Sequence, residues 1–102
     1  MDINEQENGR KYLVIIDVTD VSNLNQLHSV LKNNLGFPDF YGMNWDAFWD
    51  AITGLVEMPK KLVFIGWSNV EKYIPSDSIT IKNLLNKFKK EYPKWSCDVE
   101  YK

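Results

Sequence analysis

Asp46 and Asp50 are the two side chains whose type and spacing first suggest chemistry. They stand four residues apart in a stretch whose apolar residues recur at helical spacing, so both carboxylates project from one face of a predicted helix. Like charges at this spacing destabilise a helix by about 0.2–0.5 kcal/mol. The helix dipole offsets part of that cost for Asp46, near the predicted N-terminus, but not for Asp50. We therefore expect that something outside the fold uses Asp50.

Three interpretations of this pair follow from the residues alone. The two carboxylates could be a solvated helix face, a general acid and base as in glycosidases, or the charged part of a binding surface. The only histidine is His28, at the edge of an apolar stripe, where we expect a half-buried structural role. The chain has no Cys/His ligand spacing, no serine with a plausible base partner and no glycine-rich phosphate loop. We therefore predict a protein that is not an enzyme and needs no metal or cofactor.

The charges of the chain are unevenly distributed. The 102 residues carry a formal net charge of −2, but residues 33–59 hold four acidic residues and no Lys or Arg. The same segment holds the bulky aromatic residues Phe37, Phe40, Trp45, Phe48 and Trp49. Because phosphate contacts need cations, this segment is unsuited to binding nucleic acid. Aromatic side chains beside fixed carboxylates are instead typical of the energetic centre of a protein–protein interface.

Hydrophobic periodicity predicts the elements that would position these residues. Short apolar runs indicate strands at 12–18 and 62–65, and a weaker alternation indicates a third at 96–101. Apolar residues at helical spacing indicate helices at 24–35, 44–54 and 68–73, and a long last helix capped by Ser76, Asp77 or Ser78 and ended by Pro93. Strands separated by helices imply parallel pairing. The predicted fold class is α/β, a small single domain with a three-stranded parallel sheet flanked by helices.

The length and the chain ends predict the organisation of the protein. The chain is too short for two independent cores, so we expect a polar, flexible tail at 1–10 and a single folded domain at 11–102. The first residues show no secretion signal, and no run of residues is apolar enough to cross a membrane. We therefore expect a cytoplasmic monomer that does not bind membranes. Cys97 cannot form an internal disulfide because it is the only cysteine, and we expect it to be buried.

The stretch LGFPDFYGMNWDAFWDAITG, from Leu35 to Gly54, resembles the barstar family, the intracellular inhibitors of the ribonuclease barnase. The most specific matches are Tyr41-Gly42, Asn44, Asp46-Ala47, Trp49-Asp50 and Thr53-Gly54, preceded by Pro38 and followed by Glu57 and Pro59. The similarity runs without a gap from about Tyr12 to Pro59 and continues more loosely to Asp98. It implies the same three-stranded parallel α/β fold that periodicity predicts.

The resemblance also implies a mechanism and a set of contact residues. In inhibitors of this family, the second helix and the loop before it enter the ribonuclease active site, where carboxylates take the places of substrate phosphates. By position, Asp50 would be the phosphate mimic and Asp46 would pair with a second basic group. The implied partner-binding residues are Phe40, Tyr41, Gly42, Asn44, Trp45, Asp46, Trp49, Asp50, Thr53, Gly54 and Leu55. The implied partner is a basic ribonuclease of the extracellular or toxin type, from which the inhibitor protects its producer.

The chain departs from the family pattern at several positions. Phe40 stands where the family has tyrosine, and Met43, Trp45 and Leu55 replace a glutamate, a leucine and a tryptophan. The last helix, where the family presents glutamates toward its enzyme, has Lys87, Lys89, Lys90 and only one acidic residue there, Glu91. A basic helix would repel a basic ribonuclease, so the target is expected to be a diverged ribonuclease or another cationic toxin. The alternative is an interaction module on the same fold that inhibits no nuclease and binds another basic partner.

Overall fold

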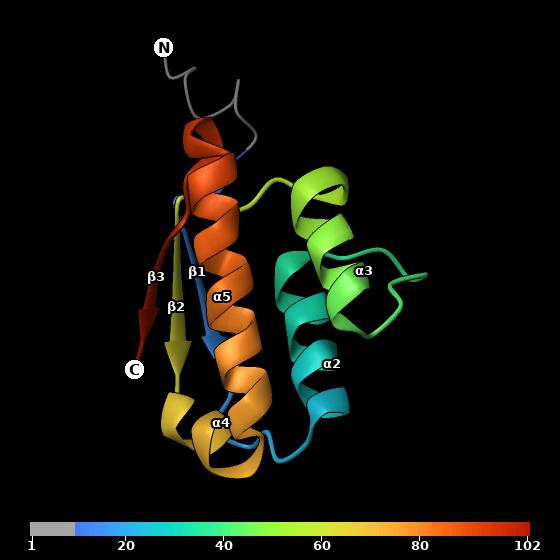
Figure 1. Ribbon diagram of the computed structural model, residues 1–102, viewed down its shortest axis with the longest axis vertical. Coiled ribbons are helices and arrows are strands. Elements are labelled where there is room, and N and C mark those ends of the chain that lie inside the picture. Colours follow the sequence, from blue (N-terminus) through green and yellow to red (C-terminus); the bar gives the residue numbers. More distant parts are fainter. Residues whose placement is uncertain (1–9) are drawn as a thin grey trace.

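Three parallel strands form the sheet: β1 (Leu13–Asp17), β2 (Lys61–Ile65) and β3 (Asp98–Tyr101), in the order β1-β2-β3. They are seen in a computed structural model that describes residues 10–102 (Figure 1). The register aligns Ile16 with Phe64 and Phe64 with Tyr101. The predicted α/β class with a three-stranded parallel sheet is confirmed, and the predicted strands differ from the observed ones only at their ends.

The sheet has one covered face and one open face. Ile16, Leu62 and Phe64 are fully buried and face the helices, because alternate side chains of a strand point to opposite faces. On the other face Ile15 is exposed, and Lys61 forms a 2.7 Å ion pair with Glu100. In Figure 1, the helices α2, α3 and α5 lie together on one side of the strands.

The helix α2 (Leu24–Leu35) begins and ends at residues whose chemistry explains its limits. Asn23 is the N-cap, since its side-chain oxygen accepts a hydrogen bond from the backbone N–H of Gln26 at 2.8 Å. Gly36 ends the helix with φ 72°, a left-handed conformation that glycine adopts without steric cost. Both ends agree with the predicted helix at 24–35.

The second predicted helix is α3 (Trp45–Asp50), and it continues as the π-helical segment η1 (Ala51–Leu55). The prediction of one α-helix over 44–54, ended by Gly54, is therefore wrong: the α-helical part ends at Asp50 and the π-helical part runs on to Leu55. The hydroxyl of Thr53 donates to the carbonyl of Trp49 at 2.7 Å, and Val56 N–H reaches back five residues to Ala51 O at 3.1 Å. A hydroxyl bound to the carbonyl four residues earlier competes with the α-helical ladder there. π-helical turns are rare in proteins as a whole, and those that occur are often found at functional sites.

The last two helices are α4 (Trp67–Tyr73) and α5 (Pro75–Glu91), followed by the 3₁₀ turn η2 (Pro93–Trp95). The expected caps Ser76, Asp77 and Ser78 all lie inside α5, so that prediction is wrong. The helix begins instead at Pro75, whose fixed φ suits the first helical position and whose missing N–H needs no partner there. The expected stop before Pro93 is confirmed.

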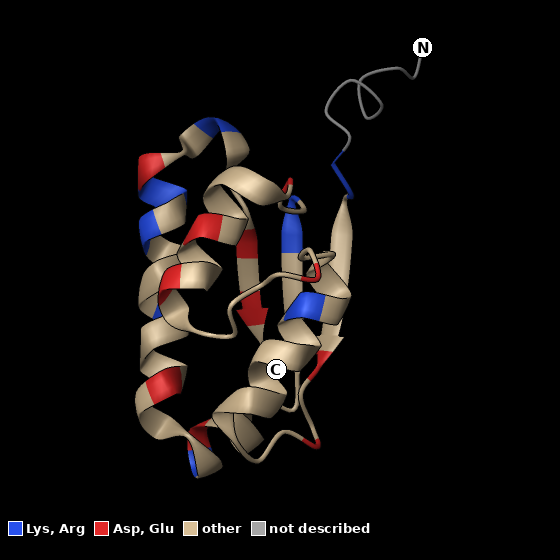
Figure 2. Cartoon of the chain, turned by 90° about the vertical axis from the view of Figure 1, so that its right-hand side faces the viewer, with Lys and Arg blue, Asp and Glu red and all other residues tan. Residues whose placement is uncertain are grey.

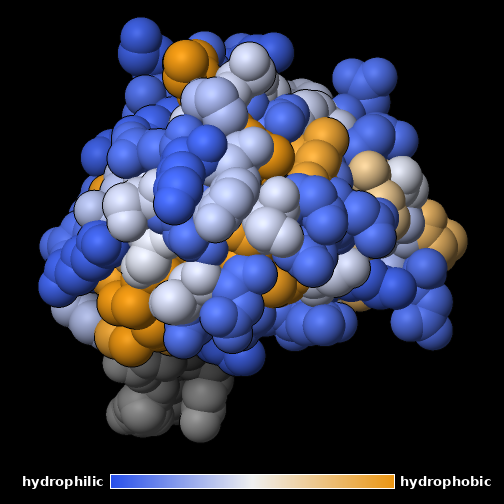
Figure 3. Space-filling model, turned by 90° about the horizontal axis from the view of Figure 1, so that it is seen from below, coloured by the Kyte–Doolittle hydropathy of each residue, from blue (hydrophilic) through white to orange (hydrophobic). Residues whose placement is uncertain are grey.

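The core lies between the sheet and the helices. Phe48 is fully buried and Ile52 is 2% exposed, as expected for apolar residues that recur at helical spacing. Cys97 is also buried, which confirms the prediction for this residue, and burial raises the pKa of its thiol to about 11. The surface seen from below is mostly hydrophilic, with separate hydrophobic patches (Figure 3). Within residues 10–102, no helix is long and apolar enough to cross a membrane.

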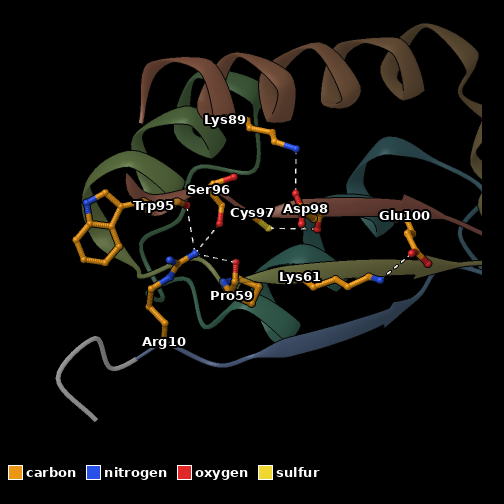
Figure 4. A network of polar contacts seen from close by, with 9 residues as sticks. All are labelled: Arg10, Pro59, Lys61, Lys89, Trp95, Ser96, Cys97, Asp98 and Glu100. Atoms are coloured by element: carbon orange, nitrogen blue, oxygen red, sulfur yellow. Dashed lines mark hydrogen bonds and ion pairs between the residues drawn. The ribbon is translucent and has the colours of Figure 1, made fainter. Parts of the chain in front are cut away.

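Arg10 joins the start of the domain to two distant segments. Residues 1–9 of the expected tail lie outside the described residues, whereas Arg10, the last residue of that predicted tail, is held by hydrogen bonds to the folded chain. The Arg10 guanidinium donates to the carbonyls of Met58 (2.9 Å), Pro59 (3.3 Å), Trp95 (3.2 Å) and Ser96 (2.9 Å), as Figure 4 shows for the last three. It also lies 5.5 Å from the centre of the Trp95 ring. These contacts hold together the segments that lead into all three strands.

Replacing Arg10 with Ala should lower the free energy of unfolding by about 1–3 kcal/mol, because carbonyl groups that accept hydrogen bonds from a charged donor lose that donor. Urea unfolding of the purified protein measures this change. Arg10→Lys is the matched control, and it should recover only part of the loss, since an ammonium group cannot reproduce the planar fork of the guanidinium. An unchanged urea midpoint for Arg10→Ala would contradict the structural role of this residue.

Candidate functional site

The loop from Phe37 to Asn44 presents one exposed aromatic ring and leads the chain into α3. Phe37 is buried in the core and holds the start of the loop, and Tyr41 N–H donates to Pro38 O at 2.9 Å to close a turn. Phe40, at the tip, is 75% exposed. Met43 has φ 57°, a left-handed conformation that is uncommon for a residue with a side chain. The loop thus places a large apolar ring in solvent immediately before α3, the helix that carries Asp46 and Asp50.

A buried pair of side chains supports this loop from inside. His28 Nδ1 and the Tyr41 hydroxyl form a hydrogen bond of 2.7 Å, and both side chains are buried. The expectation that His28 is half-buried is therefore wrong: it is 0% exposed, because Tyr41 and the Trp45 ring, 4.5 Å away, cover it. Burial lowers the pKa of His28 and raises that of Tyr41, so both groups are neutral near neutral pH. Tyr41, an implied contact residue, therefore has a supporting position in this structure.

Asn44 is held by its own polar contacts at the start of α3. Its side-chain oxygen accepts from Ala47 N–H at 2.7 Å, and its side-chain nitrogen donates to Gly42 O at 3.1 Å. A Cβ atom at Gly42 would lie 3.2 Å from Ala47 Cβ and 3.3 Å from Asn44 Nδ2. Glycine at this position therefore allows the loop to approach the helix closely. Asn44 is exposed, so it can also meet a partner.

Asp46 and Asp50 are both exposed on α3. Neither carboxylate takes part in an ion pair among residues 10–102. Figure 2 shows red residues and no blue ones on α3, with blue residues along α5 beside it. The pair is therefore a negative charge on the surface that no ion pair within the described residues neutralises.

Trp45 and Trp49 are half-buried and connect α3 to α5. Trp45 Nε1 donates to the carboxylate of Asp77 at 3.0 Å. The centre of the Trp49 ring lies 6.4 Å from the centre of the Tyr92 ring. Lys87 Nζ lies 4.5 Å from the centre of the Trp49 ring. The two tryptophans thus fix the position of the acidic helix against α5.

A hollow of about 330 Å³ lies between α3 and α5, and we call it the α3/α5 groove. Its lining residues are Trp45, Asp46, Trp49, Asp50, Thr80, Leu84 and Lys87. The last three come from α5 and were not predicted as site residues. Their spacing of four and three residues places them on one helix face, and this is the signal in the sequence that could have found them.

The remaining contact residues that the family resemblance implies lie in a second hollow, of about 390 Å³, at the C-terminal end of α3 and η1. Thr53, Gly54 and Leu55 line it on the η1 side, and Tyr92 and Trp95 line it on the α5 side. Leu55 is 48% exposed. The structure thus divides the implied residues among the loop, the α3/α5 groove and this second hollow. In the part of the chain that the structure describes, no group of three His, Cys, Asp or Glu could hold a metal ion.

The buried His28 should make the free energy of unfolding depend on pH. The folded state holds the His28 pKa below its usual value of 6.5, so the unfolded chain binds a proton first and stability falls as the pH drops below about 6.5. The slope is at most about 1.4 kcal/mol per pH unit. The pKa values of Asp17, Asp98 and Glu100 are lowered by their hydrogen-bonding partners, so these groups titrate below this range.

Urea unfolding between about pH 7.5 and 5.5 measures this dependence. His28→Gln, which cannot titrate, should have a lower but nearly constant stability over the same range. Equal pH dependence in both proteins would show that His28 is not the responsible group.

The cap at Asn44 gives a separate prediction. Asn44→Ala should lower the free energy of unfolding by about 0.5–2 kcal/mol, because Ala47 N–H loses its side-chain acceptor. Asn44→Asp keeps that acceptor and places a negative charge at a helix N-terminus, so its loss should be smaller. Thermal unfolding of the two variants under one set of conditions compares them, and equal losses would rule out the capping role.

Comparison with known proteins agrees with this architecture. Residues 12–100 match the model of a family described as barstar (barnase inhibitor). The chain is also similar to the Bacillus subtilis (strain 168) protein named "Putative ribonuclease inhibitor YrdF", with 52% identity over 50 residues. That match covers 49% of this chain and 55% of the relative, so the chain spans about half the length of the relative. The family match extends over nearly all of the described domain, and the chain therefore belongs to the barstar family.

Proposed function

We propose that the protein inhibits a ribonuclease by placing the loop 37–44 and α3 in the enzyme's active site. The observation that carries this proposal is the exposed pair Asp46 and Asp50, which form no ion pair within residues 10–102 and stand on a helix without Lys or Arg. Family membership supports a ribonuclease as the partner. The name of the similar Bacillus subtilis protein supports the same class of partner.

The electrostatics of such a complex favour the proposed geometry. A ribonuclease binds the phosphates of RNA, so its active site is cationic, and acidic groups on an inhibitor accelerate the encounter by steering. Asp50 would take the place of a substrate phosphate among the basic catalytic groups. Asp46, about one helical turn away, would pair with a second basic group. The rigid setting of α3 between the core and α5 limits the entropy lost on binding.

The neighbouring residues complete the contact surface. Phe40 offers a ring that is 75% exposed, and Leu55 offers a side chain that is 48% exposed at the other end of the helix. Aromatic side chains are enriched in interfaces, so Phe40 would be the larger contact and Leu55 would add apolar contact area. Asn44, Thr53 and Gly54 would line the contact between these ends. Tyr41, Gly42, Trp45 and Trp49 would act mainly by fixing the shape of the loop and the helix.

The expected biological setting follows from this mechanism. The partner would be a basic ribonuclease of the extracellular or toxin type, and the inhibitor would act as a cytoplasmic monomer that protects the cell producing the enzyme. The inhibitor itself would catalyse no reaction and need no cofactor, since steric occlusion and charge pairing suffice. The alternative is an interaction module that binds a basic partner without affecting RNA cleavage. A cleavage assay separates the two, because only an inhibitor stops the reaction at stoichiometric concentration.

Asp50→Ala should weaken inhibition of a barnase-type ribonuclease by at least about thirtyfold, because removing one member of a buried interfacial charge pair costs about 2–5 kcal/mol. The readout is the concentration of protein that halves the rate of RNA cleavage. Since Asp50 is exposed in the free protein, its replacement should change the free energy of unfolding by no more than about 0.5 kcal/mol.

Asp20→Ala is the matched control, because it removes the same charge from an exposed position in the connection between β1 and α2. It should leave inhibition within about threefold of the unaltered protein, as expected for a distant, screened charge. Equal inhibition by the Asp50→Ala and Asp20→Ala proteins would contradict the proposed role of Asp50. Binding of the enzyme with no loss of RNA cleavage would favour the interaction module.

A further inference from the structure

We propose that Lys87 sets the charge specificity of the α3/α5 groove, so that the preferred ribonuclease places a carboxylate opposite α5, beside the basic group that meets Asp50. This inference rests on the proposed function and specifies the chemistry of the partner. It assigns a role to a residue of α5 that lies outside the implied contact set.

The lysines of α5 point to different parts of the molecule. Lys82 lies 3.6 Å from the carboxylate of Glu71 on α4, and Lys89 forms a 2.9 Å ion pair with Asp98 at the start of β3. Figure 4 shows the Lys89 side chain directed toward Asp98. Lys87 instead lies over the ring of Trp49 on α3. Of the three lysines that the sequence singled out on the last helix, Lys87 lines the α3/α5 groove, whereas Lys89 and Lys90 do not. Lys89 is paired with Asp98 instead.

The position of Lys87 is fixed by Trp49. The ammonium group lies 4.5 Å from the centre of the indole ring, within the range of a cation–π interaction. Lys87 takes part in no ion pair among residues 10–102. Its charge is therefore held at the groove by an aromatic face and stays available to a carboxylate from outside.

The two walls of the groove carry opposite charges. Asp46 and Asp50 line it from α3 and Lys87 lines it from α5, and no ion pair joins the two sides. A partner that fits this groove must present a cation and an anion side by side. An enzyme with cations on both sides would set one of them against Lys87, and like charges at an interface cost several kcal/mol. Lys87 thus selects among basic ribonucleases by the charge that borders their active site.

The competing explanation is that Lys87 only shields Trp49. The methylene groups of a lysine can cover apolar surface while its ammonium group is in water. In that case the charge would be irrelevant to binding. Lys87→Met keeps an apolar chain of similar length over the ring and removes the charge, whereas Lys87→Glu reverses the charge. These two variants therefore separate shielding from charge selection.

The test measures the dissociation constants of the complexes with a barnase-type ribonuclease, whose active site must carry cations to bind the phosphates of RNA. Lys87→Glu should lower the dissociation constant by at least about tenfold, equivalent to about 1.4 kcal/mol, and Lys87→Met should lower it by a smaller factor. The gain should decrease at high salt, since surface charge interactions are screened. If the unaltered protein binds too weakly to measure, detectable binding by Lys87→Glu meets the same expectation.

The matched control is Lys72→Glu, because Lys72 lies 5.2 Å from the Tyr73 ring on α4 and outside the groove. It makes the same change in net charge and should alter the dissociation constant by less than about threefold. An equal gain in this variant, or no gain in Lys87→Glu, would overturn the proposal. Adding Asp50→Ala to Lys87→Glu distinguishes the two proposals. If the double variant has the same dissociation constant as Lys87→Glu alone, the role of Asp50 is rejected while the effect of Lys87 stands.

Discussion

The burial of Phe48 and Ile52 is the constraint on which the acidic surface depends. Both side chains lie in the core, so the rotation of α3 about its axis is fixed, and residues on the opposite face must point outward. Asp46 and Asp50 occupy that face, where neither carboxylate forms an ion pair within the described residues. A stable core thus maintains a surface charge pattern that is unfavourable for the isolated helix.

Contacts between distant parts of the chain hold this surface in place. The His28–Tyr41 hydrogen bond supports the loop before α3, and the hydrogen bond from Trp45 to Asp77 connects α3 to α5. Rigid support of this kind reduces the ordering that binding would otherwise require. The π-helical segment after Asp50 lets the chain leave the helix beside the second hollow, which extends the surface beyond the acidic pair.

Local patterns in the sequence were sufficient for the elements and for the acidic pair. The short apolar runs of the strands, the helical spacing of apolar residues and the four-residue spacing of the aspartates each depend on residues close together in the chain, so they could be predicted. Contacts such as that between Lys87 and Trp49 depend on how two helices pack, which no local period encodes. The full burial of His28 was missed for the same reason, since the residues that cover it come from a different helix and loop.

The most direct test of the central claim is the mode of inhibition. The rate of RNA cleavage by a barnase-type ribonuclease would be measured at several RNA concentrations, each with a series of concentrations of this protein. If the loop and α3 occupy the active site, RNA and the inhibitor compete for it. With the enzyme concentration kept well below the inhibition constant, the concentration of protein needed for half-inhibition should then rise linearly with the RNA concentration. A value that does not change with RNA concentration would show binding away from the active site and would contradict the account.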